Sequence, residues 1–525
     1  MTPAAEPGTA SALPPPRPAG LRPWPLLLRP MPQPTPSDSP TDPIVRFHPP
    51  MVAPNPPRPP VRLADRPLRP QDGPLMASDA HLRRSLLRWL DAPWIDPAWA
   101  VRAFDRQRAI DPRGLRVHAA MALLWCLCLG GPISISELAG IPLALAFLIR
   151  IHRHVGTLPC LLVQPPVIFI LSWAAWGALS LLWSDDPAKG FDQYSHARWF
   201  GAIVCLWPVV ERRSLLLGAL TLGITLGQLS QIGHAVGGSL GIDWLTWPRL
   251  PGRNSGWWDP VVGGSILTAA LGLHLPAAAW GHGKWRMLGV AGSLASLAGI
   301  AATGTRGAWI AAAVLIMLVA LAAGWRAARW RGLALACAVA SVLVVVVGAG
   351  AWTLGGQALR DRIVTARAEV TVALRDGEYN SDTGARIAMA GWAVVAFAER
   401  PLTGTGAGGY RHWVEQRLAA RGIDPASRSV HDHAHNAMLH VAATVGLPGL
   451  LIAIAFIASV LRGAARRLPG DGPPGYADGP FWSLVGLLLV SAFDVVHMNA
   501  QTGAIMAALT LLAMPWRPPP PERAA

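Results

Sequence analysis

The stretch HDHAHNAMLHVAATVGLPGLL, from His431 to Leu451, places four histidines within ten residues at the edge of a long apolar run. The run continues past Leu451 and is long enough to cross a bilayer, which takes about 20 mostly apolar residues in a helix. A helix satisfies its own backbone hydrogen bonds in lipid, so the run predicts a membrane-spanning helix. The stretch therefore predicts titratable imidazoles at one mouth of a membrane helix.

The composition extends this prediction to most of the chain. Of its 525 residues, 52% are hydrophobic and only 14% are charged, and the mean hydropathy is +0.35. These values exclude an ordinary soluble protein and predict an all-α, polytopic integral membrane bundle of about 12 transmembrane helices. The candidate spans begin near residues 117, 137, 165, 197, 215, 261, 287, 306, 332, 437, 480 and 500.

The net charge of +15 would suit a nucleic-acid partner if the basic residues formed one surface. They lie instead in the breaks between spans. Because Lys and Arg concentrate in cytoplasmic loops, they predict an orientation with both termini in the cytoplasm and a multi-pass location in the inner membrane. The breaks assigned to the cytoplasm carry Arg150 and Arg153, Arg212 and Arg213, Lys284 and Arg286, Arg326, Arg329 and Arg331, and Arg462, Arg466 and Arg467.

One large loop, residues 356–435, falls on the opposite, periplasmic side in this orientation. Loops of this size between membrane helices usually carry function. Within it the sequence predicts a helix from Thr383 to Glu399, ended by Pro401 and a glycine-rich turn. Its expected apolar face consists of Ile387, Ala390, Val394, Val395 and Ala398.

The remaining boundaries follow from composition. A Pro-rich tail is expected to be disordered and cytoplasmic, without a cleavable signal peptide, and an amphipathic segment after it suits either the inner leaflet or solvent. The five cysteines lie in or beside apolar segments, so no disulfide framework is expected. The predicted parts are the tail at 1–77, the juxtamembrane segment at 78–116, helices 1–9 at 117–355, the periplasmic loop at 356–435, helices 10–12 at 436–516 and a cytoplasmic tail at 517–525.

Three basic features converge on the predicted outer surface: Arg253, Arg306 and the cluster from His431 to His440. An arginine beside an apolar helix costs about 2.5 to 3.5 kcal/mol at the bilayer centre and less near the interface, so it suggests a function. The alternative is snorkelling to lipid phosphates. Asp494 and His497 are a further candidate polar pair, which helix packing explains equally well.

Five pieces of sequence, in order, resemble the O-antigen ligase and O-antigen polymerase superfamily of polytopic glycosyltransferases. The resemblance covers about residues 165–460, while the Pro-rich tail is extra and Thr444 stands where the family often has an acidic residue. The pieces are LLWSDDPAKG, PGRNSGWWDP, ATGTRGAWIA, GARIAMAGWAVVAFAERPLTGTGAGGY and HAHNAMLHVAATVGLPGLL.

The resemblance implies roles for individual residues. His435 matches the base that activates an acceptor sugar hydroxyl, and Arg253 and Arg306 match the arginines that hold the donor diphosphate. Arg386 and Asn436 are expected to contact substrate, although Asn436 is also a good N-cap for the following helix. Independent chemistry agrees, because a neutral imidazole suits general-base help and guanidinium groups suit a diphosphate.

The resemblance implies no metal and no cofactor. A metal site built from the histidines of HDHAH with Asp432 is the alternative, since His and Asp ligate Zn or Mn. The sequence has no GxxxxGK[ST] phosphate loop and no dinucleotide fingerprint.

The expected function is transfer of a glycan from an undecaprenyl-diphosphate carrier to an acceptor at the periplasmic face, with lipid A core as the expected acceptor. The expected partners are this lipid-linked donor, the glycan acceptor and membrane lipids, and no nucleic acid. A polymerase of O-antigen or exopolysaccharide in the same family is one alternative. A lipid-linked glycan transporter is another, and it predicts an internal repeat and charges near the bilayer midplane.

Overall fold

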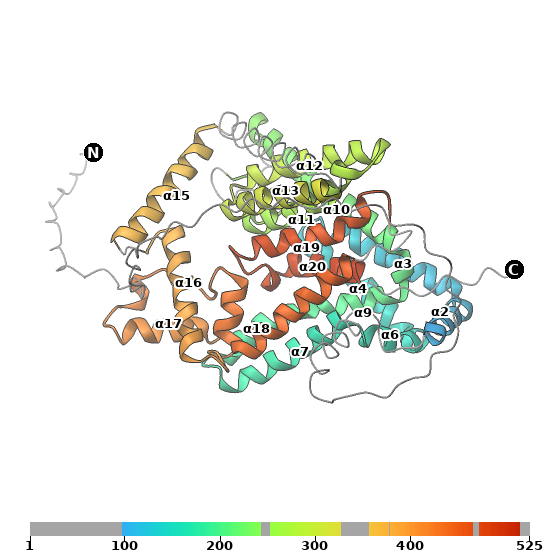
Figure 1. Ribbon diagram of the computed structural model, residues 1–525, viewed down its shortest axis with the longest axis horizontal. Helices are drawn as coiled ribbons and strands as arrows, with labels where there is room; N and C mark the ends of the chain where they lie inside the picture. The colour runs from blue at the N-terminus through green and yellow to red at the C-terminus, as the bar shows by residue number, and fades with distance from the viewer. Residues whose placement is uncertain (1–96, 243–252, 327–355, 377–378, 466–471, 515–525) are drawn as a thin grey trace, which may run out of the picture. The chain divides into compact units, whose positions relative to one another are not determined.

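Helices account for all regular secondary structure in the part of the chain that the structure describes (Figure 1). This computed structural model describes residues 97–242, 253–326, 356–376, 379–465 and 472–514. The chain divides after Arg84 into two units, and all of these residues belong to the second. The all-α prediction is therefore confirmed here, whereas the Pro-rich tail, the amphipathic segment at 78–90 and the expected span near 332 lie outside the described residues.

Six helical runs are long and apolar enough to cross a membrane, or seven if one bent pair counts as a span. The bent pair joins Ile133–Ile149 to Ile151–Leu162 at 66°. The chain is thus a membrane protein by these helices, and the count of twelve stays a prediction. The six runs are Pro165–Trp183, Pro187–Leu240, Pro260–Trp280 (α11), Gly283–Thr303 (α12), Arg306–Arg326 (α13) and Ala437–Ala464 (α18).

The remaining labelled helices include those that make up the first two runs. Two apolar helices near the C-terminal end, α19 and α20, are too short to cross a bilayer straight. In order the helices are α2 (Pro97–Ile110), α3 (Pro112–Cys128), α4 (Ile133–Ile149), α5 (Ile151–His154), α6 (Leu158–Leu162), α7 (Pro165–Ser180), α8 (Pro187–Ser195), α9 (Gly201–Leu206), α10 (Arg213–Leu240), α15 (Gly356–Asp376), α16 (Asp382–Glu399), α17 (Tyr410–Ala419), α19 (Gly479–Val490) and α20 (Ala500–Ala513).

Helix α11 lies at the centre of the packing, with 83% of its apolar window buried. It packs mainly on α12 and α19. A Cβ at Gly272 would lie 2.5 Å from the backbone of Trp482 and Ser483, so α11 and α19 are in backbone contact there. Small residues permit such close approach between membrane helices, where packing replaces the hydrophobic effect as the driving force.

Helix α18 is broken at Gly446, whose φ of 66° and ψ of −169° interrupt the helix. A Cβ there would lie 2.4 Å from the carbonyl oxygen of Leu402, so both the backbone and the space require glycine. The amide of Leu447 donates instead to the carbonyl of Pro401. The break divides α18 into a first half, 437–445, and a second half, 447–464.

The segment between α13 and α18 contains the predicted helix, observed as α16 with Ser381 as its N-cap. The predicted apolar face was wrong: Val394 is 52% exposed and Ala398 is exposed. The true buried face carries larger side chains, Met389 and Trp392, which pack with α17. That face is completed by Ala385, Ala393 and Ala396.

Charged side chains mark both ends of α13. Arg306 at its start pairs with Glu369 of α15 at 3.0 Å, and Arg326 at its end pairs with Asp478 at 3.4 Å. Elsewhere, Nε of the predicted cytoplasmic Arg150 donates to Asp111 at 2.8 Å, while its two terminal nitrogens are buried without a hydrogen-bond partner among the described residues. Which ends face the periplasm stays a prediction.

Candidate active site

A polar cleft of about 420 Å³ lies where α8, the start of α11, α16 and the segments before α18 and α20 meet. Its walls carry both signs of charge together with a few apolar side chains. The lining residues are Lys189, Asp192, Gln193, Asp259, Val261, Val262, Ser265, Arg386, Asp432, His433, His435, Asp494, Val495, Val496, Met498, Asn499 and Thr502.

His435 stands in this cleft with an unusual backbone. Its φ of 51° is the one positive value among the described non-glycine residues. Such a conformation is uncommon outside glycine and is often found at functional sites. It is held because Ala434 is buried on one side and Asn436 begins α18 on the other.

Asp494 faces the imidazole of His435. Its Oδ1 lies 3.7 Å from Nδ1 of His435, within ion-pair range but longer than a hydrogen bond. Asp494 follows α19, and its carboxylate also accepts a hydrogen bond from the amide of Val495. Neither ring nitrogen of His435 has a hydrogen-bond partner among the described residues. Both nitrogens are therefore available to bind a substrate. A small movement of the ring would also bring Nδ1 into hydrogen-bonding distance of Asp494.

The environment favours the neutral imidazole. Burial lowers the pKa of His435, and Arg386 lowers it further, while Asp494 raises it; the net direction is down. For Asp494, burial raises the pKa, but the nearby imidazole of His435 and the hydrogen bond from the amide of Val495 outweigh burial and hold the pKa below the usual range. At neutral pH the pair is thus a neutral imidazole beside an ionised carboxylate, the arrangement that a general base requires.

Among the predicted arginines, Arg386 lines the cleft. Its guanidinium donates to the carbonyl of Phe493 at 3.2 Å, next to Asp494 in the chain. This hydrogen bond places a permanent positive charge beside His435, which agrees with its effect on the pKa of that residue.

Arg253 and Arg306 meet at a different place, the turn between α12 and α13. Nε of Arg253 donates to the carbonyl of Thr303 at 2.8 Å, and its second nitrogen donates to Oγ1 of Thr305 at 2.9 Å. Arg306 donates to Glu369 and, at 2.7 Å, to Oγ1 of Thr383. The structure therefore brings the two arginines to one turn, and neither lines the cleft that contains His435.

Phe493 connects this turn to the cleft. A Cβ at Gly307 would lie 2.6 Å from Cβ of Phe493, so the first turn of α13 packs directly on the residue before Asp494. The glycines of TGTRG thus have packing and turn roles, since Gly304 ends α12 with a φ of 63°. They are explained without a ligand at the backbone.

Asn436 is the N-cap of α18, as the alternative interpretation predicted. Its side-chain oxygen accepts from the amide of Leu439 at 3.0 Å, and its nitrogen donates to the carbonyl of Ala492 at 3.1 Å. The cap joins the start of α18 to the segment that carries Asp494. A contact between Asn436 and substrate stays a prediction.

The other histidines surround His435. The ring centroids of His431 and His433 lie 4.8 and 4.3 Å from that of His435. Asp432 points elsewhere and pairs with Lys189 at 3.1 Å and Arg411 at 3.3 Å.

A possible metal-ligand set therefore differs from the one the sequence suggested. Ligand atoms of His433, His435 and Asp494 all lie within 4.8 Å of one another, and they include Asp494 in place of Asp432. Two imidazoles and a carboxylate suit a transition metal.

Sequence reasoning missed two features of the cleft. It paired Asp494 with His497, whereas the structure brings Asp494 to His435 and turns the ring of His497 toward Trp173, 6.2 Å away between centroids. It also gave no role to Lys189, although LLWSDDPAKG contains it. An acidic residue in SAFDVVHMN, at the end of an apolar run, was the available signal for Asp494.

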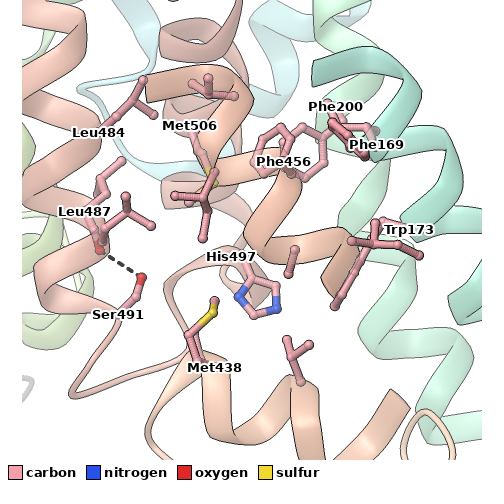
Figure 2. A pocket seen from close by; sticks show the side chains of 18 of the residues that line it. Phe169, Trp173, Phe200, Met438, Phe456, Leu484, Leu487, Ser491, His497 and Met506 are labelled. Carbon is pink, nitrogen blue, oxygen red and sulfur yellow. Dashed lines mark hydrogen bonds between the residues drawn. The ribbon is translucent and has the colours of Figure 1, made fainter. Parts of the chain in front are cut away.

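An apolar cavity of about 130 Å³ lies on the other side of the segment that carries His497 (Figure 2). Both halves of α18 line it, through Met438 and Phe456, and α7 contributes Trp173. The hydroxyl of Ser491 donates to the carbonyl of Leu487, which leaves the lining almost wholly apolar.

A small hollow borders both this cavity and the cleft. It shares Trp173 and His497 with the apolar cavity and Gln193 and Met498 with the cleft. The cleft that contains His435 therefore adjoins an apolar space between predicted membrane helices.

Comparison with protein families bears on this arrangement. Residues 291–454 match the family described as O-antigen ligase. Over this segment the chain is similar to the O-antigen ligase family. The matched region includes Arg306, Arg386, His435 and Asn436, and it ends before Asp494. No curated protein showed significant similarity to the chain. The family match confirms the predicted resemblance and identifies a membrane protein of glycosyltransferase type.

Proposed function

We propose that this protein transfers a glycan from an undecaprenyl-diphosphate carrier to an acceptor, with lipid A core as the acceptor, at the periplasmic face of the inner membrane. The observation that carries the proposal is the imidazole of His435 facing the carboxylate of Asp494, 3.7 Å away, inside a polar cleft that adjoins an apolar cavity. A reaction between a lipid-linked donor and a hydroxyl-bearing acceptor needs both environments side by side.

His435 is the proposed general base. A sugar hydroxyl is a weak nucleophile at neutral pH, and a positioned base contributes about 10²- to 10⁴-fold to such a step. As the hydroxyl oxygen forms its bond to the anomeric carbon, its proton passes to His435 and the carbon–oxygen bond to the diphosphate breaks. Asp494 is a positioning residue that orients the ring and stabilises the imidazolium that forms.

The donor diphosphate leaves as an anion, so cations near the cleft support the proposal. Arg386 and Lys189 line the cleft, and Arg386 donates a hydrogen bond to the carbonyl of Phe493, which precedes Asp494. Arg253 and Arg306 are the positions that the family resemblance assigns to the diphosphate. In this structure the guanidinium of Arg306 pairs with the carboxylate of Glu369. The diphosphate must replace that carboxylate if Arg306 is to bind the donor.

The lipid of the donor explains the location of the site. A polyprenyl chain must stay in an apolar environment while its diphosphate reaches the cleft, and the adjoining hollows offer such a path. The bond between the anomeric carbon and the diphosphate already carries the energy for transfer, so we propose that neither nucleotide nor metal is needed.

The test is reconstitution. Purified wild-type protein in nanodiscs, supplied only with lipid-linked donor glycan and a lipid A core acceptor, should form the covalent product. Movement of donor across the membrane without product would favour the transporter.

A gene deletion separates ligase from polymerase. We expect loss of glycan from the surface acceptor while long lipid-linked polymer accumulates. Accumulation of single repeat units instead would identify a polymerase.

A further inference from the structure

A second, wider hollow lies between α4 and the segment from Arg198 into α9. Its volume is about 750 Å³, and its walls are mainly apolar. Leu138 and Ile141 line it and are 68% and 55% exposed, so the hollow is open toward the outside of the described bundle. Since α4 and α9 lie in predicted membrane segments, we expect this α4–α9 groove to face lipid.

Small residues make the groove wide. Gly140 and Ala144 of α4 line one wall, and Gly201 and Ala202 of α9 line the other. A Cβ built on Gly201 would meet no heavy atom within 4 Å. The space in front of Gly201 is therefore free to receive a ligand.

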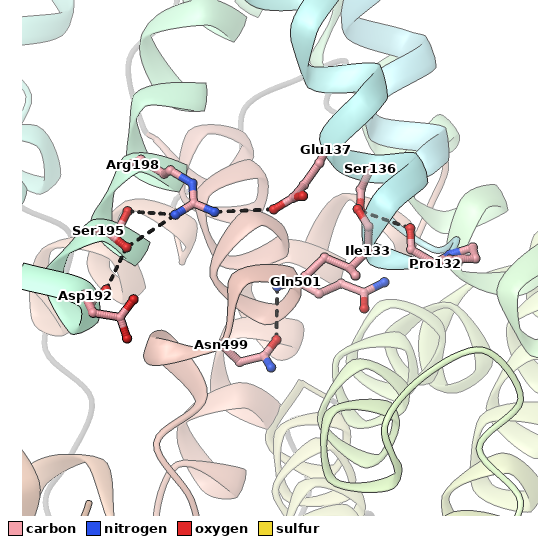
Figure 3. Close-up of polar contacts among 9 residues, drawn as sticks. All are labelled: Pro132, Ile133, Ser136, Glu137, Asp192, Ser195, Arg198, Asn499 and Gln501. Carbon is pink, nitrogen blue, oxygen red and sulfur yellow. Dashed lines mark hydrogen bonds and ion pairs between the residues drawn. The ribbon is translucent and has the colours of Figure 1, made fainter. Parts of the chain in front are cut away.

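A strip of polar side chains leads from this groove toward the cleft (Figure 3). Arg198 of the groove donates to Glu137 at 3.3 Å and to the carbonyl of Ser195 at 3.4 Å. The hydroxyl of Ser195 in turn donates to the carbonyl of Asp192, whose residue lines the cleft.

The opposite side of the strip comes from the start of α20. Asn499 lines the cleft and caps α20 by accepting from the amide of Gln501 at 3.0 Å. The side chain of Gln501 donates to the carbonyl of Gly131, just before α4, at 2.5 Å. The exposed charged groups of Glu137, Arg198 and Asp192 thus extend from the groove to the cleft, and such groups pair readily with sugar hydroxyls. Gln501 is buried and holds the segment before α4 in place.

We propose that the α4–α9 groove holds the acyl chains of the acceptor, a glycolipid with several chains, while its saccharide extends along the polar strip to His435. This inference rests on the proposed function. The relative volumes favour the acceptor as the occupant of the groove. The apolar cavity beside His497, at about 130 Å³, suits the single chain of a polyprenyl donor, whereas the groove, at about 750 Å³, suits several chains side by side.

Filling the groove tests the proposal. Gly201→Trp places an indole in the open space, and Gly218→Trp is the matched control, because Gly218 is an exposed helical glycine of α10 with nothing within 4 Å of a built Cβ. With a hexa-acylated glycolipid acceptor, Gly201→Trp should raise the acceptor KM about tenfold, the effect of losing roughly two buried methylene groups. The donor KM, and the KM for the same acceptor saccharide without acyl chains, should not change.

Direct binding separates this proposal from the proposed function. A glycolipid acceptor with a diazirine on an acyl chain should crosslink to the peptide that contains Leu138 and Ile141, and Gly201→Trp should reduce that crosslink while Gly218→Trp does not. Crosslinking without any transfer by the wild type would support the groove and contradict the proposed function. The groove assignment is overturned if the crosslink maps elsewhere, if both tryptophan variants behave alike, or if Gly201→Trp raises the donor KM alone.

Discussion

Nδ1 of His435 lies 3.7 Å from Oδ1 of Asp494, although one residue precedes α18 and the other follows α19. Two features bring them together. The amide of Ala437 donates to the carbonyl of Ser491 at 2.8 Å, and the side chain of Asn436 donates to the carbonyl of Ala492. The pairing of base and carboxylate is thus built into the backbone connection between the two helices.

Removal of the proposed base is the first prediction. His435→Ala should lower the rate of transfer by about two to four orders of magnitude, because general-base help is lost, while donor binding persists. Steady-state transfer and a separate binding measurement with lipid-linked donor check both parts. His412→Ala, at an exposed position of α17, is the control and should transfer normally. Near-normal transfer by the His435→Ala protein would sink the catalytic assignment.

The pH profile tests the roles of Asp494 and Arg386. Transfer needs neutral His435, so the rate should rise with pH through the pKa of this residue, which burial places below its ordinary value of about 6.5. Asp494 favours the imidazolium, so Asp494→Asn should move the acid limb to lower pH and also lower the plateau rate. Arg386 disfavours the imidazolium, so Arg386→Gln should move the limb to higher pH.

Two neighbouring histidines also titrate and bear on how the pH profile is interpreted. His431 and His433 face His435, and both have pKa values lowered by burial, so both are neutral over most of the useful range. The positioning role is contradicted if Asp494→Asn lowers the rate at every pH by the same factor without shifting the limb. A merely structural contribution would give that result.

The arginines are tested by substitutions that keep their charge. Arg306→Lys and Arg253→Lys should each weaken donor engagement, because lysine lacks the planar fork that binds a diphosphate in two places. A lost charge-assisted contact costs roughly 1.5 to 3 kcal/mol, or about ten- to more than a hundredfold in donor affinity. Arg386→Lys should show the larger loss in the rate itself, because Arg386 lines the cleft. Donor Kd and kcat, measured separately, check both expectations.

Glu369 supplies a control for Arg306. If the diphosphate replaces this carboxylate, Glu369→Gln should tighten donor binding in the wild-type background and have less effect in Arg306→Lys. Unchanged donor affinity in all of these variants would show that Arg306 serves the packing of α13, α15 and α16 instead.

The sequence predicted the helical class, the start of α18, the cap at Asn436 and the bounds of α16 because each depends on local signals: apolar length, a capping side chain, and a proline after the helix. The sequence did not predict the features that depend on tertiary contacts. The buried face of α16 is set by Trp392 and Met389 packing on α17, which periodicity alone did not reveal. Asp494 was assigned to His497, its neighbour in sequence, because nothing local shows that α18 and α19 join through Ala437 and Ser491.

Topology is a separate prediction. The basic breaks between spans place residues 356–435 in the periplasm, together with the cleft. A reporter inserted after Gly422, which lies in an exposed turn with a φ of 70°, should be active only if it is a periplasmic reporter. A reporter after Arg153 should show the opposite behaviour. Cytoplasmic activity at Gly422 would overturn the proposed location of the reaction.

The last prediction concerns metal. His433, His435 and Asp494 could ligate an ion, so the metal-free mechanism needs a direct check. We expect transfer to survive dialysis against EDTA, because a neutral His435 serves as the base unaided and Arg386 supplies fixed positive charge beside it. Added Zn²⁺ should not raise the rate. If EDTA abolishes transfer and Zn²⁺ or Mn²⁺ restores it, and if His433→Ala removes the response, these three residues form a metal centre and His435 is not the base.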